Sequence, residues 1–150
     1  MKEIERKYLV NVSKWNDLEK PDPIKIIQGY LMRKSDLVVR LRLKNNEAFL
    51  TLKGNQNGII RDEFEYSIPP SDAQEMLEKF TDRFIEKDRY EIMVGNHLWE
   101  VDVFQGKLHG LVLAEIELKN ENESFLHPEW IEKDVSTDAD YFNAVLIEKC

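Results

Sequence analysis

The feature that most constrains the fold is an alternation of charged and apolar side chains with a period of two residues. It begins in the opening stretch MKEIERKYLV, where Glu3, Glu5 and Lys7 occupy every second position. Residues two apart in a β-strand share one face and lie about 6.6 Å apart along it. Two carboxylates and an ammonium therefore line one side of the predicted strand. Such a side is either an ordinary solvated face or a site that holds cations together with an anionic group.

The same alternation continues through most of the chain, and side chains two apart within a strand often carry like charges. Arg40 and Arg42 form one such pair, and Glu115 and Glu117 form another. Neighbouring like charges on one face repel each other, whereas a surface selected for solubility mixes the two signs. The charged set on these faces consists of the acids Glu3, Glu5, Glu63, Glu65, Glu100, Asp102, Glu115 and Glu117 and the bases Lys7, Arg40, Arg42, Lys53, Arg61, Lys87 and Arg89. The pattern indicates a charged interior with an acidic wall and a basic wall.

The strand-like runs and the turns between them predict how these faces come together. Runs rich in β-branched and aromatic residues follow the opening strand at residues 24–32, 37–43, 48–54, 59–68, 83–94, 97–104 and 111–119. Most connections are short, which favours antiparallel neighbours. Eight antiparallel strands can close into a barrel with room for one small ligand. The predicted fold is therefore α+β and mainly β: an eight-stranded antiparallel β-barrel tunnel with a few flanking helices.

Helix-capping residues predict the flanking helices. Ser13 is interpreted as the N-cap of a short helix, Ser71 and Gln74 as the capping box of a second, and Thr137 as the cap of a third. The polar stretch 119–130 is interpreted as a linker. The three tryptophans are interpreted as packing residues. The three histidines share no metal-ligand spacing and are interpreted as structural or surface residues.

Composition limits the classes of protein and partner. A length of 150 residues suits a single domain, residues 1–150. The formal net charge of −8 argues against nucleic acid or an anionic membrane as partner. Cys150 is the only cysteine, so no internal disulfide can form, and the sequence shows neither a membrane-spanning run nor a signal-like segment. We therefore expect a cytoplasmic protein, with a homodimer among the oligomeric states left open.

The charged set also indicates which ligands could neutralise it. Clustered carboxylates without thiols suit hard cations such as Mg²⁺ or Mn²⁺. Arginine forks match phosphate oxygens, and lysines add point charge. Because Mg²⁺ commonly binds through one or two carboxylates plus substrate phosphates, a substrate with linked phosphates could bridge the two walls.

In addition, the sequence resembles the CYTH superfamily, also called triphosphate tunnel metalloenzymes. EIERK matches the ExExK signature, and QGYL, VRLRL, TLKG, RDEFEY, EKDRY, WEVDVFQGKLHGLVLAEIEL and DVSTDADYFNAVL follow in the expected order. ExExK alone is a weak signal, but the ordered set covers almost the whole chain. The resemblance implies an eight-stranded tunnel that binds a small-molecule triphosphate with a divalent metal, and in particular it resembles small bacterial inorganic triphosphatases.

The resemblance further implies roles for individual residues. It matches metal binding to Glu3, Glu5, Asp102, Glu115 and Glu117, with further acidic lining at Glu63, Glu65 and Glu100. It matches phosphate binding to Arg40, Arg42, Lys53, Arg61, Lys87 and Arg89. Lys7 and Tyr30 match a lysine and a tyrosine that handle the attacking water in the triphosphatase members, although Tyr30 also fits ordinary packing. The implied reaction is in-line attack of water, activated by the metal, on a terminal phosphorus.

Four functions remain open at this point. The expected function is metal-dependent hydrolysis of inorganic tripolyphosphate, because the short chain shows no inserted segment for a base or a thiazole ring. A class IV adenylyl cyclase would share the tunnel but would need an adenine pocket. Thiamine triphosphatase is a further alternative. A non-catalytic polyphosphate-binding module would need mainly the bases, so the full acidic wall argues against it.

Overall fold

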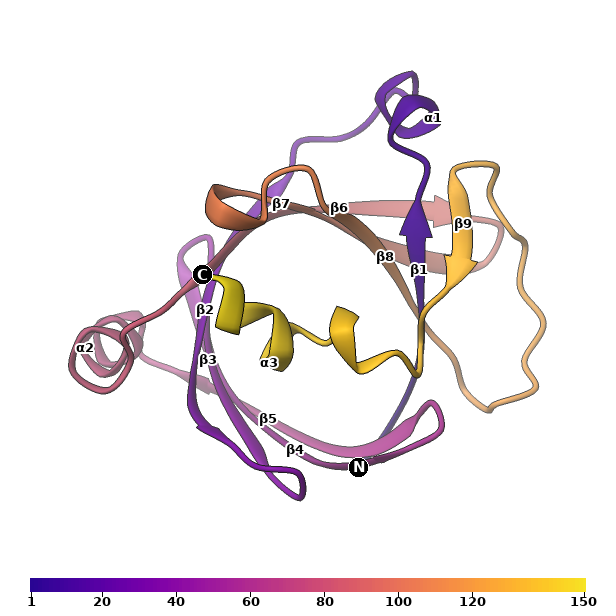
Figure 1. Ribbon diagram of the computed structural model, residues 1–150. Helices are drawn as coiled ribbons and strands as arrows, with labels where there is room; N and C mark the ends of the chain where they lie inside the picture. The colour runs from indigo at the N-terminus through magenta and orange to yellow at the C-terminus, as the bar shows by residue number, and fades with distance from the viewer.

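Eight antiparallel strands close into a ring in the computed structural model, which describes residues 1–150 (Figure 1). These strands are β1 (Lys2–Val10), β2 (Ile24–Arg33), β3 (Val38–Lys44), β4 (Glu47–Asn57), β5 (Ile60–Ile68), β6 (Ile85–Val94), β7 (His97–Phe104) and β8 (Val112–Glu117). Their order around the ring is β5-β4-β3-β2-β6-β7-β8-β1, and β1 also pairs with β5. The predicted eight-stranded antiparallel barrel is therefore confirmed.

Strand β1 occupies the position where the ring closes. One of its edges pairs with β8, with Lys7 opposite Glu115, and the other pairs with β5 around Glu3 and Arg61. A ninth strand, β9 (Ile131–Asp134), pairs with the later part of β1. The sequence did not predict β9, because it is a four-residue strand that directly follows a polar stretch.

The remaining elements are short helices placed around the ring. They are α1 (Val12–Asn16), α2 (Pro70–Phe80), η1 (Gly106–Leu108), η2 (Ala139–Tyr141), α3 (Asn143–Leu146) and η3 (Ile147–Lys149). None of them is long and apolar enough to cross a membrane.

The main hydrophobic core lies on the outer face of β1, β7 and β8. Trp99 on β7 is fully buried, and its ring centroid lies 5.6 Å from that of Trp130. The Trp130 ring lies 5.6 Å from that of Trp15 on α1. Edge-to-face packing of this kind adds to the stabilisation from burial alone. The interpretation of the three tryptophans as packing residues is confirmed.

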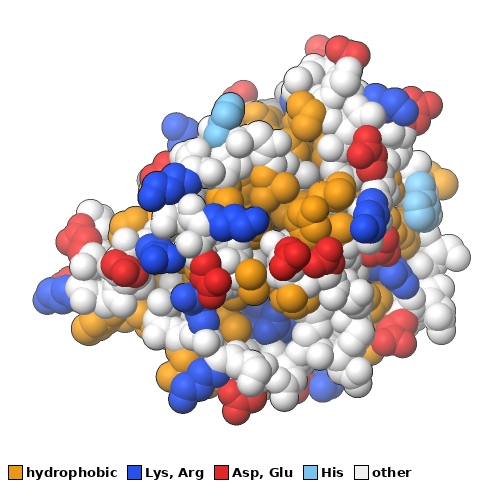
Figure 2. All heavy atoms as spheres, viewed as in Figure 1, with side chains coloured by type: hydrophobic (Ala, Val, Ile, Leu, Met, Phe, Trp, Pro, Cys, Tyr) orange, Lys and Arg blue, Asp and Glu red, His pale blue; other side chains and the backbone are white.

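The C-terminal segment, residues 139–149, crosses one mouth of the ring. In Figure 1 its three helical turns run in yellow across the opening. Leu146 and Ile147 anchor it in a second hydrophobic cluster that includes Ile85 and Phe104. Figure 2, viewed from the same side, shows side chains filling the centre of the ring instead of an open channel. The C-terminal segment therefore covers this end of the lumen.

The two predicted N-terminal helix starts are displaced. Asn11, and not Ser13, caps α1, because its side-chain oxygen accepts from the backbone N–H of Lys14 at 3.0 Å. Helix α2 begins at Pro70, so Ser71 lies inside the first turn and forms no capping bond. Proline suits the first helical position because its φ is already helical and no N–H is lost there.

The prediction of one helix capped by Thr137 is wrong. Asp138 caps the short turn η2, and Phe142 is extended (ψ 134°), which separates η2 from α3. At this break the carbonyl of Tyr141 accepts a hydrogen bond from Lys7 Nζ at 3.1 Å.

Candidate active site

A cavity of about 450 Å³ occupies the lumen beneath the C-terminal segment. Of its 21 lining residues, only six are hydrophobic, so its walls suit a charged ligand better than an apolar one. The predicted site residues that line it are Glu3, Glu5, Lys7, Tyr30, Arg40, Arg42, Lys53, Arg61 and Glu115. The fold thus brings together residues from β1, β2, β3, β4, β5 and β8.

The order of strands around the ring sorts the charges into two arcs. The basic side chains of β4, β3 and β6 lie on one side, together with β2, which adds Arg33 at the cavity wall. The acidic strands β7, β8, β1 and β5 follow one another on the other side. Lys7 on β1 and Arg61 on β5 are the exceptions. The arcs meet at two seams, between β6 and β7 and between β4 and β5.

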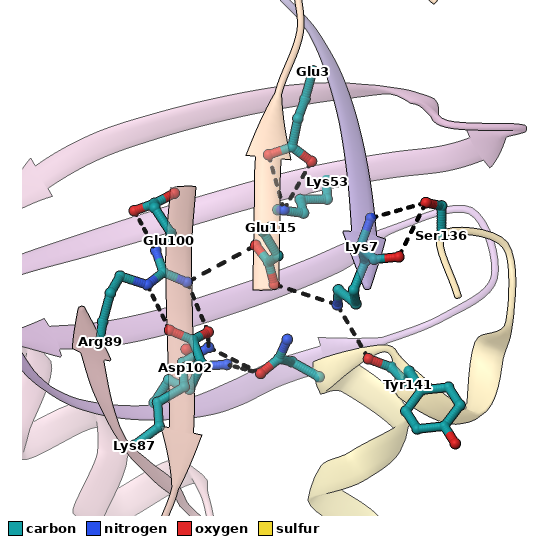
Figure 3. A network of polar contacts seen from close by, with 12 residues as sticks. Glu3, Lys7, Lys53, Lys87, Arg89, Glu100, Asp102, Glu115, Ser136 and Tyr141 are labelled. Atoms are coloured by element: carbon teal, nitrogen blue, oxygen red, sulfur yellow. Dashed lines mark hydrogen bonds and ion pairs between the residues drawn. The ribbon is translucent and has the colours of Figure 1, made fainter. Parts of the chain in front are cut away.

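At the β6/β7 seam, opposite charges are joined directly (Figure 3). Arg89 holds Asp102 through two bonds of 2.7 and 2.9 Å and Glu100 through one of 2.8 Å, and Lys87 Nζ lies 2.7 Å from Asp102. Burial alone would raise the pKa of Asp102, but Arg89 and Lys87 outweigh it and lower the pKa to about 2. Burial lowers the pKa of Lys87 to about 7 in spite of Asp102. The charged side chains of this seam therefore neutralise one another.

The β4/β5 seam is more open to solvent. Lys53 Nζ lies 3.0 Å from both Glu3 and Glu63, so it ties β4 to β1 and β5. Arg40 lies 3.5 Å from Glu65, whose side chain is 41% exposed. An ion pair with one exposed partner contributes little to stability because water screens it.

Lys7 stands among the carboxylates of the acidic arc. Its Nζ lies 3.4 Å from Glu115 and donates to the Tyr141 carbonyl (Figure 3). Burial opposes ionisation of Glu115, but Lys7 and Arg89 keep its pKa well below the ordinary value. The backbone N–H of Lys7 donates to Ser136 Oγ at 2.8 Å, which fixes the strand at this point.

Three groups in the cavity are incompletely satisfied by the protein. Arg42 forms no ion pair and is held only by the amide oxygen of Gln28, at 2.9 and 3.0 Å. The buried Nε of Arg40 has no hydrogen-bond acceptor. Glu5 forms no ion pair, and burial together with Glu115 and Glu3 raises its pKa well above the ordinary value. A ligand that brings both negative charge for the arginines and positive charge for Glu5 would satisfy all three.

The register explains why neither arginine of β3 has a carboxylate directly opposite it, although Arg40 also reaches Glu65. Arg40 lies opposite Tyr30 on β2 and Thr51 on β4. Arg42 lies opposite Gln28 on β2 and Phe49 on β4. Every directly opposed residue is uncharged, and accordingly burial and the neighbouring Arg40 and Arg89 lower the pKa of Arg42 to about 9. An anion in the cavity would stabilise its charged form.

Several predicted site residues lie outside the cavity wall. Lys87, Arg89 and Asp102 form the β6/β7 seam, while Glu100 and Glu117 line a second hollow near His97 and Glu123. Glu63 and Glu65 flank the cavity as partners of Lys53 and Arg40. No three His, Cys, Asp or Glu side chains are placed together closely enough to hold a metal ion by themselves. The five carboxylates predicted as metal ligands therefore do not form one cluster.

Three polar residues that organise the cavity were not predicted from the sequence. Gln28 shares an inward face with Tyr30, Asn143 lies in the C-terminal segment, and Ser136 contacts the backbone of Lys7. A search for charged side chains overlooks all three because they are neutral. Only Gln28 could have been predicted to face the cavity, because it lies two positions before Tyr30 on the same predicted strand face.

Solved structures share this architecture. The solved structure of an inorganic triphosphatase is 33% identical, covers 97% of this chain and 93% of its own, and superposes with a TM-score of 0.64. A protein from Pyrococcus horikoshii has a TM-score of 0.59 over 80% of each chain at 18% identity, and that likeness shows the fold alone.

Sequence relatives extend over the full chain. A protein from Acetivibrio thermocellus named inorganic triphosphatase is 42% identical over 148 residues, which are 98% of this chain and 94% of that protein. An inorganic triphosphatase from Nitrosomonas europaea is 35% identical over 150 residues, with 97% of each chain covered. The family model for the CYTH domain matches residues 1–144. The chain therefore belongs to the CYTH domain family.

Proposed function

We propose that this chain, acting as one domain over residues 1–150, hydrolyses inorganic tripolyphosphate to pyrophosphate and phosphate with the help of a divalent metal. The observation that carries the proposal is one cavity lined by Arg42, which has no ion pair, by Arg40, whose buried Nε has no acceptor, and by the unpaired carboxylate of Glu5. A triphosphate with its metal supplies both missing charges. The names of the Acetivibrio and Nitrosomonas relatives support the same reaction.

The carboxylates of the cavity fit a hard cation. CYTH triphosphatases generally depend on a divalent metal. Glu5 forms no ion pair, and Glu115 is its neighbour across the acidic arc. We assign the metal to these two carboxylates, with Glu3 released from Lys53 as a third ligand, and we expect Mg²⁺ or Mn²⁺. One or two carboxylates suffice for Mg²⁺ when phosphate oxygens complete the coordination, which agrees with the absence of a preformed cluster.

The bases of the cavity would hold the phosphates and offset the charge of the leaving pyrophosphate. Arg40 and Arg42 can each present a planar fork to phosphate oxygens, and Lys53 and Arg61 add charge beside them. When bound, the divalent cation would add Lewis-acid charge and lower the pKa of the attacking water. Lys7 and Tyr30, on β1 and β2, would orient that water against the terminal phosphorus.

The direct test measures phosphate release from tripolyphosphate, ATP and thiamine triphosphate with Mg²⁺ or Mn²⁺, and with a chelator. We expect the highest kcat/KM for tripolyphosphate and no activity in excess chelator. Glu5→Gln and Glu115→Gln should each reduce kcat strongly at saturating metal. Cyclic AMP formed from ATP would support the cyclase alternative, and full activity in chelator would contradict the metal assignment.

A second test separates orienting residues from phosphate clamps. Lys7→Ala should lower kcat more than it raises KM, because its contact with the nucleophile strengthens in the transition state. Tyr30→Phe should act in the same way but more mildly, and the double variant should fall well short of additivity. A Lys7→Ala effect confined to KM would identify Lys7 as another phosphate clamp.

The compartment follows the same reasoning as the substrate. Because the proposed substrate is a small water-soluble anion, we propose a cytoplasmic enzyme.

A further inference from the structure

We propose that Gln28 and Asn143 form a neutral amide relay that positions Arg42 for the substrate phosphates while leaving its charge uncompensated. Both are positioning residues: they act through Arg42, Lys87 and Tyr30. The proposal rests on the proposed function, and it adds a role for two residues to which the resemblance and the relatives assign none.

The first step of the relay joins Gln28 to Arg42. Gln28 is fully buried, and its Oε1 accepts from both Nε and Nη2 of Arg42, at 3.0 and 2.9 Å. Two bonds from one fork fix the plane of the guanidinium. A carboxylate would make the same contacts and would also neutralise the charge, as Asp102 does for Arg89. The amide therefore gives Arg42 an orientation without a counter-ion.

The second step joins Gln28 to the C-terminal segment. The Nε2 of Gln28 donates to the Oδ1 of Asn143 at 3.3 Å and to the hydroxyl of Tyr30 at 3.2 Å. These bonds set which end of the Gln28 amide faces Arg42, because the donor end must point to the two acceptors. Asn143 is thus the residue that fixes the amide from outside the sheet.

The third step joins the relay to the basic side of the β6/β7 seam. Asn143 Oδ1 also accepts from Lys87 Nζ at 3.0 Å. One amide oxygen therefore links β2 and β6 to the C-terminal segment, which is anchored by Leu146 and Ile147 in its own hydrophobic cluster. The arrangement of Arg42 consequently depends on a segment more than 100 positions later in the chain.

The main test replaces the neutral acceptor by a charged one of the same shape. Gln28→Glu keeps an oxygen acceptor beside Arg42, but this oxygen belongs to a negatively charged carboxylate. We expect KM for tripolyphosphate to rise roughly 10- to 100-fold, the range that follows from losing a charge-assisted hydrogen bond, while kcat changes less. The melting temperature should change little, because the new ion pair with Arg42 offsets the loss of the bonds that Gln28 Nε2 donates to Tyr30 and Asn143. Gln74→Glu on the exposed side of α2 adds the same charge away from the lumen and serves as the matched control.

Asn143→Ala provides a second variant that does not place a charge in the core. It removes the acceptor from Gln28 and Lys87, so KM should rise several-fold with a smaller change in kcat, and Asn122→Ala in the exposed loop before β9 is its control. Unchanged KM in both Gln28→Glu and Asn143→Ala would overturn the relay. A lower kcat with unchanged KM would also overturn the relay. A residue that positions Arg42 for phosphate binding should change KM.

Binding of tripolyphosphate in metal-free buffer, measured by titration calorimetry, separates this proposal from the proposed function. If the wild-type chain binds tripolyphosphate but does not hydrolyse it with any metal, the proposed function fails, while weaker binding by Gln28→Glu still supports the relay. If the wild-type chain hydrolyses tripolyphosphate and the variants bind it equally well, the relay fails alone. Absence of both binding and hydrolysis in the wild type would overturn both.

Discussion

The β6–β7 side and the β3 side of the lumen contain similar bases but differ in how their charge is balanced. On β6, Arg89 contacts Asp102 at 2.7 Å and Glu100 at 2.8 Å. On β3, Arg42 contacts only the amide oxygen of Gln28, and Arg40 retains a buried Nε without an acceptor. On the paired side the protein neutralises the bases itself, whereas the unpaired side leaves Arg42 available for a ligand.

The contrast arises from register and not from composition. The Gly95-Asn96 turn aligns β6 with β7 so that Arg89 lies opposite Asp102. Strand β3 lies between β2 and β4, whose inward residues opposite Arg40 and Arg42 are uncharged. A buried ion pair is costly to break once formed, because the remaining partner is left without a counter-charge. The same residue type is therefore neutralised by carboxylates on one side and, under the proposed function, would bind substrate on the other.

The largest effect should come from breaking the paired side. Asp102→Asn leaves Lys87 and Arg89 buried with a neutral partner, so the free energy of unfolding should fall by about 3–5 kcal/mol. Urea denaturation of the metal-free protein measures it. Asp62→Asn, which breaks the exposed pair with Lys2, is the control and should change little. Equal stability of the two variants would mean that the seam does not hold the ring.

A smaller but selective effect should come from the unpaired side. Arg42→Ala should raise KM for tripolyphosphate roughly 10- to 100-fold, since it removes a charged donor to phosphate. The free energy of unfolding should hold or increase, because burial and Arg40 already disfavour the charged form of Arg42. Arg6→Ala, on the outer face beside Asp134, is the matched control for kinetics. A marked loss of stability with unchanged KM would assign Arg42 to the structural side.

The charged lumen could be predicted from the sequence, but the division of its bases into a paired and an unpaired side could not. The period-two alternation predicted the charged lumen, and a tight turn fixes the register of β6 with β7 through local geometry. The ring order depends on long-range pairings, β2 with β6 and β1 with β8, which no turn specifies. Without that order, Arg42 and Arg89 look equivalent in the sequence.

The C-terminal segment shows a second limit of sequence reasoning. Its apolar spacing predicted one helix after Thr137, whereas the helical turns are interrupted at Phe142, and the carbonyl of Tyr141 contacts Lys7. The spacing of apolar residues in a segment cannot indicate that one of its backbone carbonyls accepts a hydrogen bond from a lysine far away in the sequence. For the same reason, Asn143 could not be recognised as a partner of Gln28 and Lys87 before the fold was known.

A still smaller effect is expected from the unpaired carboxylate. Glu5→Gln should raise the melting temperature of the metal-free protein at neutral pH, because burial and the neighbouring Glu115 and Glu3 disfavour its ionised form. The pKa of Glu5 is raised in the folded state, so between its ordinary value near 4.5 and the folded value the folded chain binds more protons. The stability of the wild type must then fall as pH rises through this window.

The advantage of Glu5→Gln over the wild type should accordingly vanish below about pH 4.5 and be complete above the folded pKa. Melting curves across this range, with Glu132→Gln on the exposed edge of β9 as control, measure it. An advantage that is constant at every pH would show that ionisation of Glu5 is not its cause.

The smallest effect should come from the solvent-exposed seam between β4 and β5, where the two sides of the comparison meet. Glu65 lies 3.5 Å from Arg40, and its exposed side chain means that the pair contributes at most about 1 kcal/mol. Glu65→Gln keeps an acceptor for Thr51 but frees the charge of Arg40 for phosphate. Tripolyphosphate should therefore bind a few-fold more tightly, and added salt should reduce the difference from the wild type because it screens the exposed pair. Weaker binding by Glu65→Gln would show instead that Glu65 positions Arg40, and would place Arg40 with Arg89 on the paired side of the lumen.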